Sequence, residues 1–240
     1  MKAAHPLSCF VTGTDTGVGK TLVASGLLLA MRNAGIRAAG FKPVAAGIEP
    51  GPGGPRHEDV EQLRAASGIA LRADEACGVL LTRAIAPHIG AAQEGIPIDP
   101  AALAAAARAL QARAQALVVE GVGGFRVPLS DTADSAELAR LLGLPVVLVV
   151  GLRLGCLSHA LLTAEAIERR GLPLAGWVAN RIDPAMQEPD RNREALERRL
   201  GAPLLGELAW MGASTSEARA QEVAAGAGRA WLALRQEAHS

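Results

Sequence analysis

Short apolar segments alternate with longer segments of helical character along most of the chain. The apolar segments have the length of buried strands, and they are residues 7–12, 36–41, 117–120, 145–150, 174–179 and 204–208. The helical segments are 20–33, 59–67, 101–116, 133–142, 158–170, 191–200 and 216–234. This alternation predicts an α/β fold with a mainly parallel sheet and helices on both faces. Because we find no internal repeat and no long linker, residues 1–240 are expected to form a single domain.

The residue composition limits the classes of function. The 24 basic and 24 acidic residues cancel, which argues against a nucleic-acid-binding surface over the whole chain. Three Phe, three Trp and no Tyr leave few rings for stacking on bases. The three cysteines form no CxxC pair and the five histidines lack the spacing of metal ligands, so we expect neither disulfides nor a zinc site. Since we find no signal peptide and no apolar run of about 20 residues, we expect a cytoplasmic protein that binds no membrane.

The strongest motif is the loop 13–21, with the sequence GTDTGVGKT, which follows a predicted strand and opens a predicted helix. Glycines let backbone N–H groups turn toward phosphate oxygens, and the helix N-terminus adds positive potential. In such loops the lysine, here Lys20, reaches the β- and γ-phosphates, and the hydroxyl of Thr21 binds Mg²⁺. The motif therefore predicts a P-loop NTPase-like domain that binds ATP with Mg²⁺. Five residues separate Gly13 from Gly19, one more than in the usual motif.

Three charged residues are candidates for the site: Glu120 and Lys42 at predicted strand ends, where parallel sheets bind their ligands, and Asp59 at the start of a predicted helix. Glu120 ends a buried strand, and a carboxylate there is costly unless it faces a metal ion or a cation. Asp59 is either a second carboxylate for Mg²⁺ or an ordinary negative charge at a helix N-terminus. Lys42 follows a strand and either neutralises a transferring phosphoryl group or is a solvated lysine. After Lys42, residues 44–56 are rich in glycine and proline and are expected to form a loop.

Segments along nearly the whole chain resemble the dethiobiotin synthetase family, including its longer phosphate loop. Each segment alone is a weak or moderate signal, but together and in this order they are highly specific. The segments are 10–21, 40–47, 86–89, 92–95, 119–124, 128–131, 149–156, 176–180 and 203–207.

The resemblance implies an ATP-dependent ligase of biotin biosynthesis. In this family 7,8-diaminopelargonate takes up CO₂ as a carbamate, ATP converts the carbamate to a carbamic-phosphoric anhydride, and the second amine closes the ring. The products are dethiobiotin, ADP and phosphate. Because this is phosphoryl transfer, the protein mainly positions groups and stabilises charge. The resemblance also implies a homodimer in which the second subunit completes the site for the substrate carboxylate.

The resemblance assigns roles to individual residues. Lys20, Lys42 and Thr16 would be catalytic, and Thr21, Asp59 and Glu120 would hold Mg²⁺. Asn180 would recognise the adenine. The nucleotide would contact Gly17, Val18, Gly19, Lys20, Thr21, Leu22, Asp59, Glu120, Gly121, Val122, Gly123, Asn180, Arg181, Ala209, Trp210 and Met211. The substrate would contact Thr16, Lys42 and Ala46 and, from the second subunit, the helix start formed by Leu154, Gly155, Cys156, Leu157 and Ser158.

The chain departs from the family pattern at three positions. Ala46 stands where the family often has serine, so one hydroxyl contact to the substrate is missing. Ala209 stands where a proline often lines the purine pocket, which leaves the base selectivity open. Gly17 replaces an acidic residue that some members carry.

Two other functions are compatible with a phosphate loop. A switch ATPase of the ParA/MinD kind would carry a second lysine where this chain has Asp15, so the loop argues against that function. A regulatory domain related to cobyric acid synthase could keep the loop without ligase activity. Lys42 and the segments around His88 and Cys156 favour the synthetase.

Overall fold

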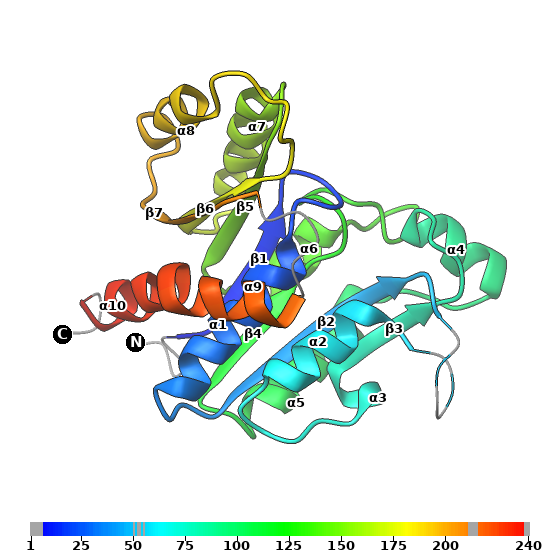
Figure 1. Ribbon diagram of the computed structural model, residues 1–240. Coiled ribbons are helices and arrows are strands. Elements are labelled where there is room, and N and C mark those ends of the chain that lie inside the picture. Colours follow the sequence, from blue (N-terminus) through cyan, green and yellow to red (C-terminus); the bar gives the residue numbers. More distant parts are fainter. Residues whose placement is uncertain (1–6, 50, 52–53, 55, 211–215, 238–240) are drawn as a thin grey trace.

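The core of the protein is a seven-stranded sheet in the order β3-β2-β4-β1-β5-β6-β7 (Figure 1). The computed structural model describes residues 7–49, 51, 54, 56–210 and 216–237. Neighbouring strands pair in parallel throughout this part, which confirms the predicted α/β class. The strands are β1 Cys9–Gly13, β2 Ala38–Ala46, β3 Cys77–Leu81, β4 Ala116–Glu120, β5 Val146–Leu152, β6 Leu174–Arg181 and β7 Leu204–Leu208.

Helices cover both faces of the sheet, so the central strands are buried on both sides. In β5, Val147 and Val149 pack against the layer that contains α1, while Leu148 and Val150 pack against the layer of α7. The first layer consists of α1 Lys20–Asn33, α2 Glu58–Ala66, α9 Ser216–Val223, the π-helical turn η1 Ala224–Gly228 and α10 Arg229–Glu237. The opposite layer consists of α5 Pro100–Gln111, α6 Ser135–Leu142, α7 Cys156–Arg169 and α8 Pro189–Glu197. No helix in the described ranges combines the length and the apolar character needed to cross a membrane.

The edge of the sheet around β3 differs from the prediction. Strand β3 was missed, as were the helices beside it, α3 Ala73–Ala76 and α4 Pro87–Glu94. The strand has the sequence CGVLL and is only partly buried, so it lacks the continuous apolar run of the central strands. Pairing with β3 extends β2 to Ala46, so the expected loop 44–56 was wrong for its first three residues. Lys42 accordingly lies within a strand rather than after one.

Close packing between α1 and α9 depends on a glycine in α1. A Cβ atom at Gly26 would lie 2.3 Å from Cγ1 of Val223 and 3.1 Å from the carbonyl oxygen of Ala220. Both neighbours belong to α9, so the small residue allows this helix to approach α1. Figure 1 shows α9 crossing in front of α1, near the start of α1 and the phosphate loop.

We predict that Gly26→Ala destabilises the protein by about 1–3 kcal/mol, because overpacking outweighs the gain of about 1 kcal/mol in helix propensity. Denaturant unfolding measures this change. Gly226→Ala is the control, since a Cβ atom there would have no neighbour within 4 Å. The interpretation is wrong if Gly26→Ala is as stable as Gly226→Ala.

Candidate active site

The phosphate loop connects β1 to α1 and is held by its own backbone. Gly17 and Gly19 have φ values of 74° and 93°, a region that glycine adopts without strain. A Cβ atom at Gly19 would lie 2.4 Å from Nδ2 of Asn180, so this position requires glycine for a second reason. The Nζ of Lys20 donates to the carbonyl oxygen of Asp15 at 2.8 Å, which keeps the lysine folded over the loop. The loop therefore has the form expected for a phosphate cradle.

A buried cation lies beside this loop, between two carboxylates. Phe41 of β2 pairs with Val119 of β4, so the next residues, Lys42 and Glu120, come side by side. The Nζ of Lys42 lies 2.5 Å from Oε1 of Glu120 and 2.7 Å from Oδ2 of Asp59. The hydroxyl of Thr21, at the start of α1, donates to the same Oε1 at 2.7 Å. The structure thus brings together a predicted catalytic lysine and all three predicted Mg²⁺ ligands.

Burial and neighbouring charges shift the pKa values in this cluster. Burial lowers the pKa of Lys42, but Glu120 and Asp59 together raise it above its ordinary value. Burial raises the pKa of the Glu120 carboxyl, and Lys42 opposes this only in part. Burial also acts to raise the pKa of Asp59, but Lys42 outweighs it, so that pKa is lowered. For Lys20, burial lowers the pKa to about 8 in spite of Glu120.

The donor set fits a magnesium ion. The second carboxylate oxygen of Glu120, Oε2, is buried and has no hydrogen-bond partner among the described residues. A buried polar atom without a partner is costly, and a metal ion would satisfy it. Thr21 and Asp59 supply the other oxygens, in keeping with the preference of Mg²⁺ for one or two carboxylates beside phosphate. This set has two carboxylates and one hydroxyl, and the described part of the chain contains no group of three His, Cys, Asp or Glu that could hold a metal ion.

The loop and the charged cluster open into one cavity of about 980 Å³. Its far wall is mostly apolar and includes Val44, Ile85, Val122 and Val127. The predicted residues that line it are Thr16, Gly17, Gly19, Lys20, Thr21, Leu22, Lys42, Ala46, Asp59, Glu120, Val122 and Gly123. Val18 and Gly121 are buried and do not line the cavity. Most of the predicted site is therefore contiguous.

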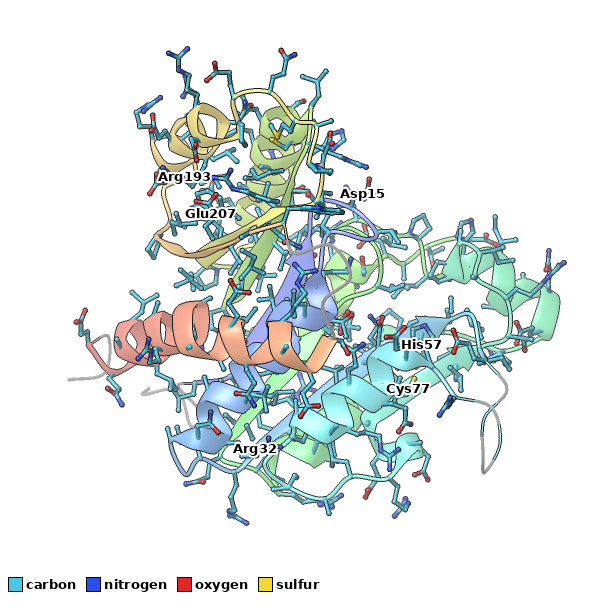
Figure 2. The ribbon with its side chains drawn as sticks, in the orientation of Figure 1. Asp15, Arg32, His57, Cys77, Arg193 and Glu207 are labelled. Carbon is cyan, nitrogen blue, oxygen red and sulfur yellow. The ribbon has the colours of Figure 1, made fainter. Side chains whose placement is uncertain are left out.

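Other predicted site residues lie away from this cavity. The side chain of Arg181 pairs with Asp190 and Glu207, and Figure 2 shows Glu207 beside Arg193 on the α8 side of the sheet. Ala209 and Trp210 are exposed after β7, and Met211 falls outside the described residues. The helix start formed by Leu154, Gly155, Cys156, Leu157 and Ser158 lies at the beginning of α7 and does not line the cavity of its own chain.

The phosphate loop also contacts the segment before α7. The carboxylate of Asp15 accepts a hydrogen bond from the backbone N–H of Thr16 and pairs with Arg153. These bonds, the first of them most, lower the pKa of Asp15. Figure 2 shows Asp15 on this loop and His57 at the start of α2, at two different parts of the site. Asp15 thus ties the loop to the segment before α7.

Sequence reasoning missed two residues of this site. His57 caps α2 by accepting from the N–H of Asp59, and its Nε2 lies 3.3 Å from the carbonyl oxygen of Ala46. Arg219 of α9 lines the cavity, and its Nη2 donates to Oδ1 of Asn180 at 3.4 Å. Neither residue belongs to a motif. Only the pairing of β2 with β3 and the placement of α9 bring them to the site.

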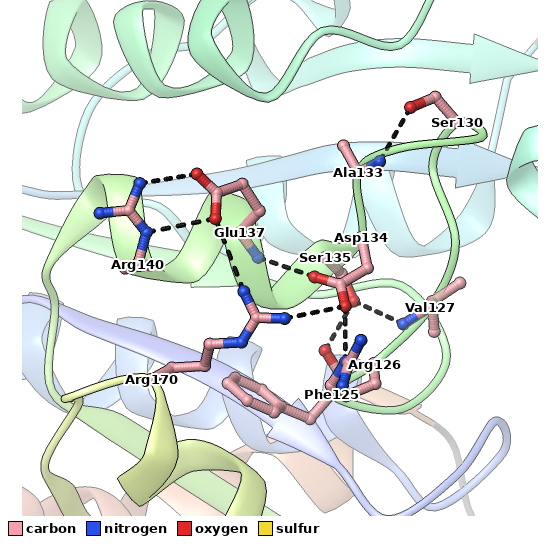
Figure 3. A network of polar contacts seen from close by, with 10 residues as sticks. All are labelled: Phe125, Arg126, Val127, Ser130, Ala133, Asp134, Ser135, Glu137, Arg140 and Arg170. Carbon is pink, nitrogen blue, oxygen red and sulfur yellow. Dashed lines mark hydrogen bonds and ion pairs between the residues drawn. The ribbon is translucent and has the colours of Figure 1, made fainter.

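A polar network fixes the loop that follows Glu120 (Figure 3). The hydroxyl of Ser135 donates to the carbonyl oxygen of Phe125 at 2.7 Å and accepts from the N–H of Val127 at 2.9 Å. Arg126 and Arg170 both pair with Asp134, which caps α6. Because Val127 lines the cavity, this network sets the shape of its apolar wall.

Comparison with known proteins identifies relatives of the chain. A family model described as an AAA domain matches residues 8–218. The ATP-dependent dethiobiotin synthetase BioD of Aromatoleum aromaticum is 59% identical over 202 residues, which are 84% of this chain and 90% of that protein.

Solved structures with the same fold are more distant in sequence. The cell division ATPase MinD of Pyrococcus furiosus matches with a TM-score of 0.57 and 16% identity, over 97% of this chain and 98% of that one. A ParA family ATPase of Chlorobium tepidum matches with a TM-score of 0.52 and 13% identity, over 94% and 92%. At these identities the likeness confirms the P-loop NTPase-like fold and nothing more.

The lowered pKa of Lys20 leads to a prediction about pH. We expect phosphate binding to require the charged lysine, which is the main form below pH 8 and is lost as the pH rises above it. We expect the Kd of a magnesium complex of a non-hydrolysable ATP analogue to rise above pH 8 by up to about tenfold per pH unit. Calorimetry between about pH 7 and about pH 9.5 measures this. Lys20→Gln should bind more weakly with a flat profile, and a variant profile parallel to the wild type would contradict the assignment.

Proposed function

The chain belongs to the dethiobiotin synthetase family, whose members are ATP-dependent ligases, and we propose that it converts 7,8-diaminopelargonate, CO₂ and ATP to dethiobiotin, ADP and phosphate. The observation that carries this proposal is the convergence of Lys42 with the phosphate loop. The buried ammonium of Lys42 and the hydroxyl of Thr21 contact the same oxygen of Glu120. A second cation, besides Lys20, therefore lies where the terminal phosphate and the substrate would meet.

The chemistry of the proposed reaction balances in three steps. One amine of the substrate adds to CO₂ and loses a proton, which gives a carbamate. A carbamate oxygen then attacks the γ-phosphorus, the bond to the bridging oxygen breaks, and ADP leaves. The second amine attacks the carbonyl carbon of this anhydride and gives up one proton to the leaving phosphate or to water, the carbon–oxygen bond breaks, phosphate leaves, and the cyclic urea is complete. Negative charge builds up on oxygens in each step, so fixed cations are the main requirement.

Lys20 and Lys42 supply these cations from two directions. Lys20 would hold the β- and γ-phosphates from the loop, and Lys42 would hold the carbamate and the transferring phosphoryl group from β2. The raised pKa of Lys42 keeps its ammonium charged at neutral pH, which this role requires. Thr16, exposed on the loop, would donate a hydrogen bond near the same centre. Mg²⁺ held by Thr21, Asp59 and Glu120 would neutralise charge on the phosphate oxygens.

The apolar wall of the cavity suits the hydrocarbon chain of the substrate. Val122, Val127 and Ile85 offer contacts to methylene groups, and Ala46 offers only a methyl group and its backbone. The far carboxylate of the substrate would reach the start of α7 in the second subunit of a homodimer. Two features support this arrangement: the free N–H groups of a helix N-terminus bind carboxylates, and Leu154 and Leu162 of this region are 94% and 62% exposed.

Incubation of the protein with 7,8-diaminopelargonate, bicarbonate and MgATP should yield dethiobiotin and one phosphate per product, which mass spectrometry and a phosphate assay measure. Omission of the diamine should abolish this phosphate release. Tight ATP binding without dethiobiotin would contradict the proposal and would leave a switch or regulatory domain as the function.

Lys42→Ala should lower kcat by at least about 100-fold, because a cation that stabilises developing charge is removed. The Kd of ATP should change by less than about fivefold, since Lys20 and the loop backbone remain. Arg169→Ala removes an equal charge from a side chain that is 78% exposed and should leave both values unchanged. An equal loss of turnover and of ATP affinity in Lys42→Ala would refute its catalytic role.

A further inference from the structure

The side chain of His57 joins the end of β2 to the start of α2. Strand β2 ends at Ala46, and the chain comes back to this point at His57, directly before α2. The backbones of Glu49 and Arg56 pair across the excursion between them, with N–O distances of 2.8 and 3.1 Å. At the base of the excursion, Nε2 of His57 lies 3.3 Å from the carbonyl oxygen of Ala46. The ring therefore bridges the two ends of this segment, and its side chain is only 15% exposed.

The two ring nitrogens of His57 have different roles. Nδ1 accepts a hydrogen bond from the backbone N–H of Asp59 at 3.2 Å, so this nitrogen carries no proton of its own. The ring proton therefore lies on Nε2, which donates to the carbonyl oxygen of Ala46. The first bond caps α2, as expected of a residue at this position. The second bond ties the capped helix start to the end of β2, and we call it the β2–α2 tie.

The β2–α2 tie connects two elements whose charged side chains meet in the site. Lys42 belongs to β2 and Asp59 to α2, and their side chains are 2.7 Å apart. The two carboxylates that would hold Mg²⁺ are not equally enclosed, because the side chain of Glu120 is 1% exposed and that of Asp59 is 30% exposed. The sheet register places Glu120, whereas the position of the Asp59 carboxylate depends on how the start of α2 is anchored.

We propose that His57 is a positioning residue for Asp59, and that the β2–α2 tie holds the start of α2 where the carboxylate of Asp59 can bind Mg²⁺ together with Thr21 and Glu120. Groups that orient a metal ligand without binding the metal contribute about 10- to 100-fold in metal affinity or activity. His57 lines the cavity beside Asp59, so it lies close enough to act in this way. This inference rests on the proposed function, which includes the metal at these three residues.

The strengthening of nucleotide binding by Mg²⁺ tests the position of Asp59. Calorimetry gives the Kd of a non-hydrolysable ATP analogue in EDTA and in Mg²⁺, and we call the ratio of these two values the metal effect. Asparagine offers an acceptor at the position of Nδ1, and glutamine offers a donor at the position of Nε2. His57→Asn therefore keeps the cap, loses the tie and should lower the metal effect about tenfold, whereas His57→Gln keeps the tie and should stay within about threefold of the wild type. The Kd in EDTA should be unchanged in both, since neither variant alters the phosphate loop.

Asp99→Ala is the matched control for the loss of a helix cap. Asp99 caps α5 by accepting from the N–H of Ala101 at 2.8 Å, and it is exposed and does not line the cavity. This variant should lower the Tm about as much as His57→Gln does, and it should keep the wild-type metal effect. A wild-type metal effect in His57→Asn, or an equal fall in His57→Gln or Asp99→Ala, would overturn the proposal, because the effect would then not follow the contact with Ala46.

These measurements separate a failure of this inference from a failure of the proposed function. Calorimetry with the analogue needs neither the diamine nor turnover, so the role of His57 can be decided even if no dethiobiotin forms. If Mg²⁺ does not strengthen binding of the analogue to the wild type, the metal site is wrong and the role of His57 is refuted with it. If the wild type shows the metal effect and His57→Asn retains it, only the role of His57 is refuted.

Discussion

The buried ion pair between Lys42 and Glu120 sets requirements that the surrounding structure has to meet. Taking an ammonium and a carboxylate out of water costs several kcal/mol for each ion, and their attraction offsets this only when the geometry is good. The two residues meet because β2 and β4 are neighbours in register, and Asp59 and Thr21 join them from the starts of α2 and α1. An apolar pair would be the simpler way to stabilise a sheet at this place. The charges therefore support the proposed binding of phosphate and a metal ion, which would supply new partners for the same groups.

The close-packed positions around this pair follow the same constraint. The phosphate loop can approach the strand that carries Asn180 only because Gly19 has no side chain. The α1 helix, which presents Thr21 to Glu120, is in turn held by α9 through the close contact at Gly26. Local backbone geometry, helix packing and charge placement thus converge on one edge of the sheet. This edge consists of the carboxyl ends of β1, β2 and β4, where parallel sheets bind their ligands.

The central part of this arrangement could be predicted from the sequence, because the signals are local. The phosphate loop has a recognisable spacing, and Glu120 is an acidic residue at the end of a short apolar strand. The edge strand β3 could not be predicted, since it is half-buried, contains Gly78 and lacks an alternating pattern. Because β3 was not predicted, the sequence could not show that β2 continues to Ala46 or that Ile85 lines the cavity. Arg219 is an ordinary charged residue of a helix until the tertiary fold places it against Asn180.

The fold alone does not distinguish this chain from switch ATPases such as MinD, whose structures share its topology at low identity. The difference lies in single positions of a common frame. Asp15 pairs with Arg153 and fixes the loop within its own subunit, while Lys42 approaches the phosphate site from β2. The charged cluster beside the loop is held by mutually dependent contacts, because Lys42 contacts both Asp59 and Glu120 and Thr21 contacts the same oxygen of Glu120, so the loss of one partner disturbs the others.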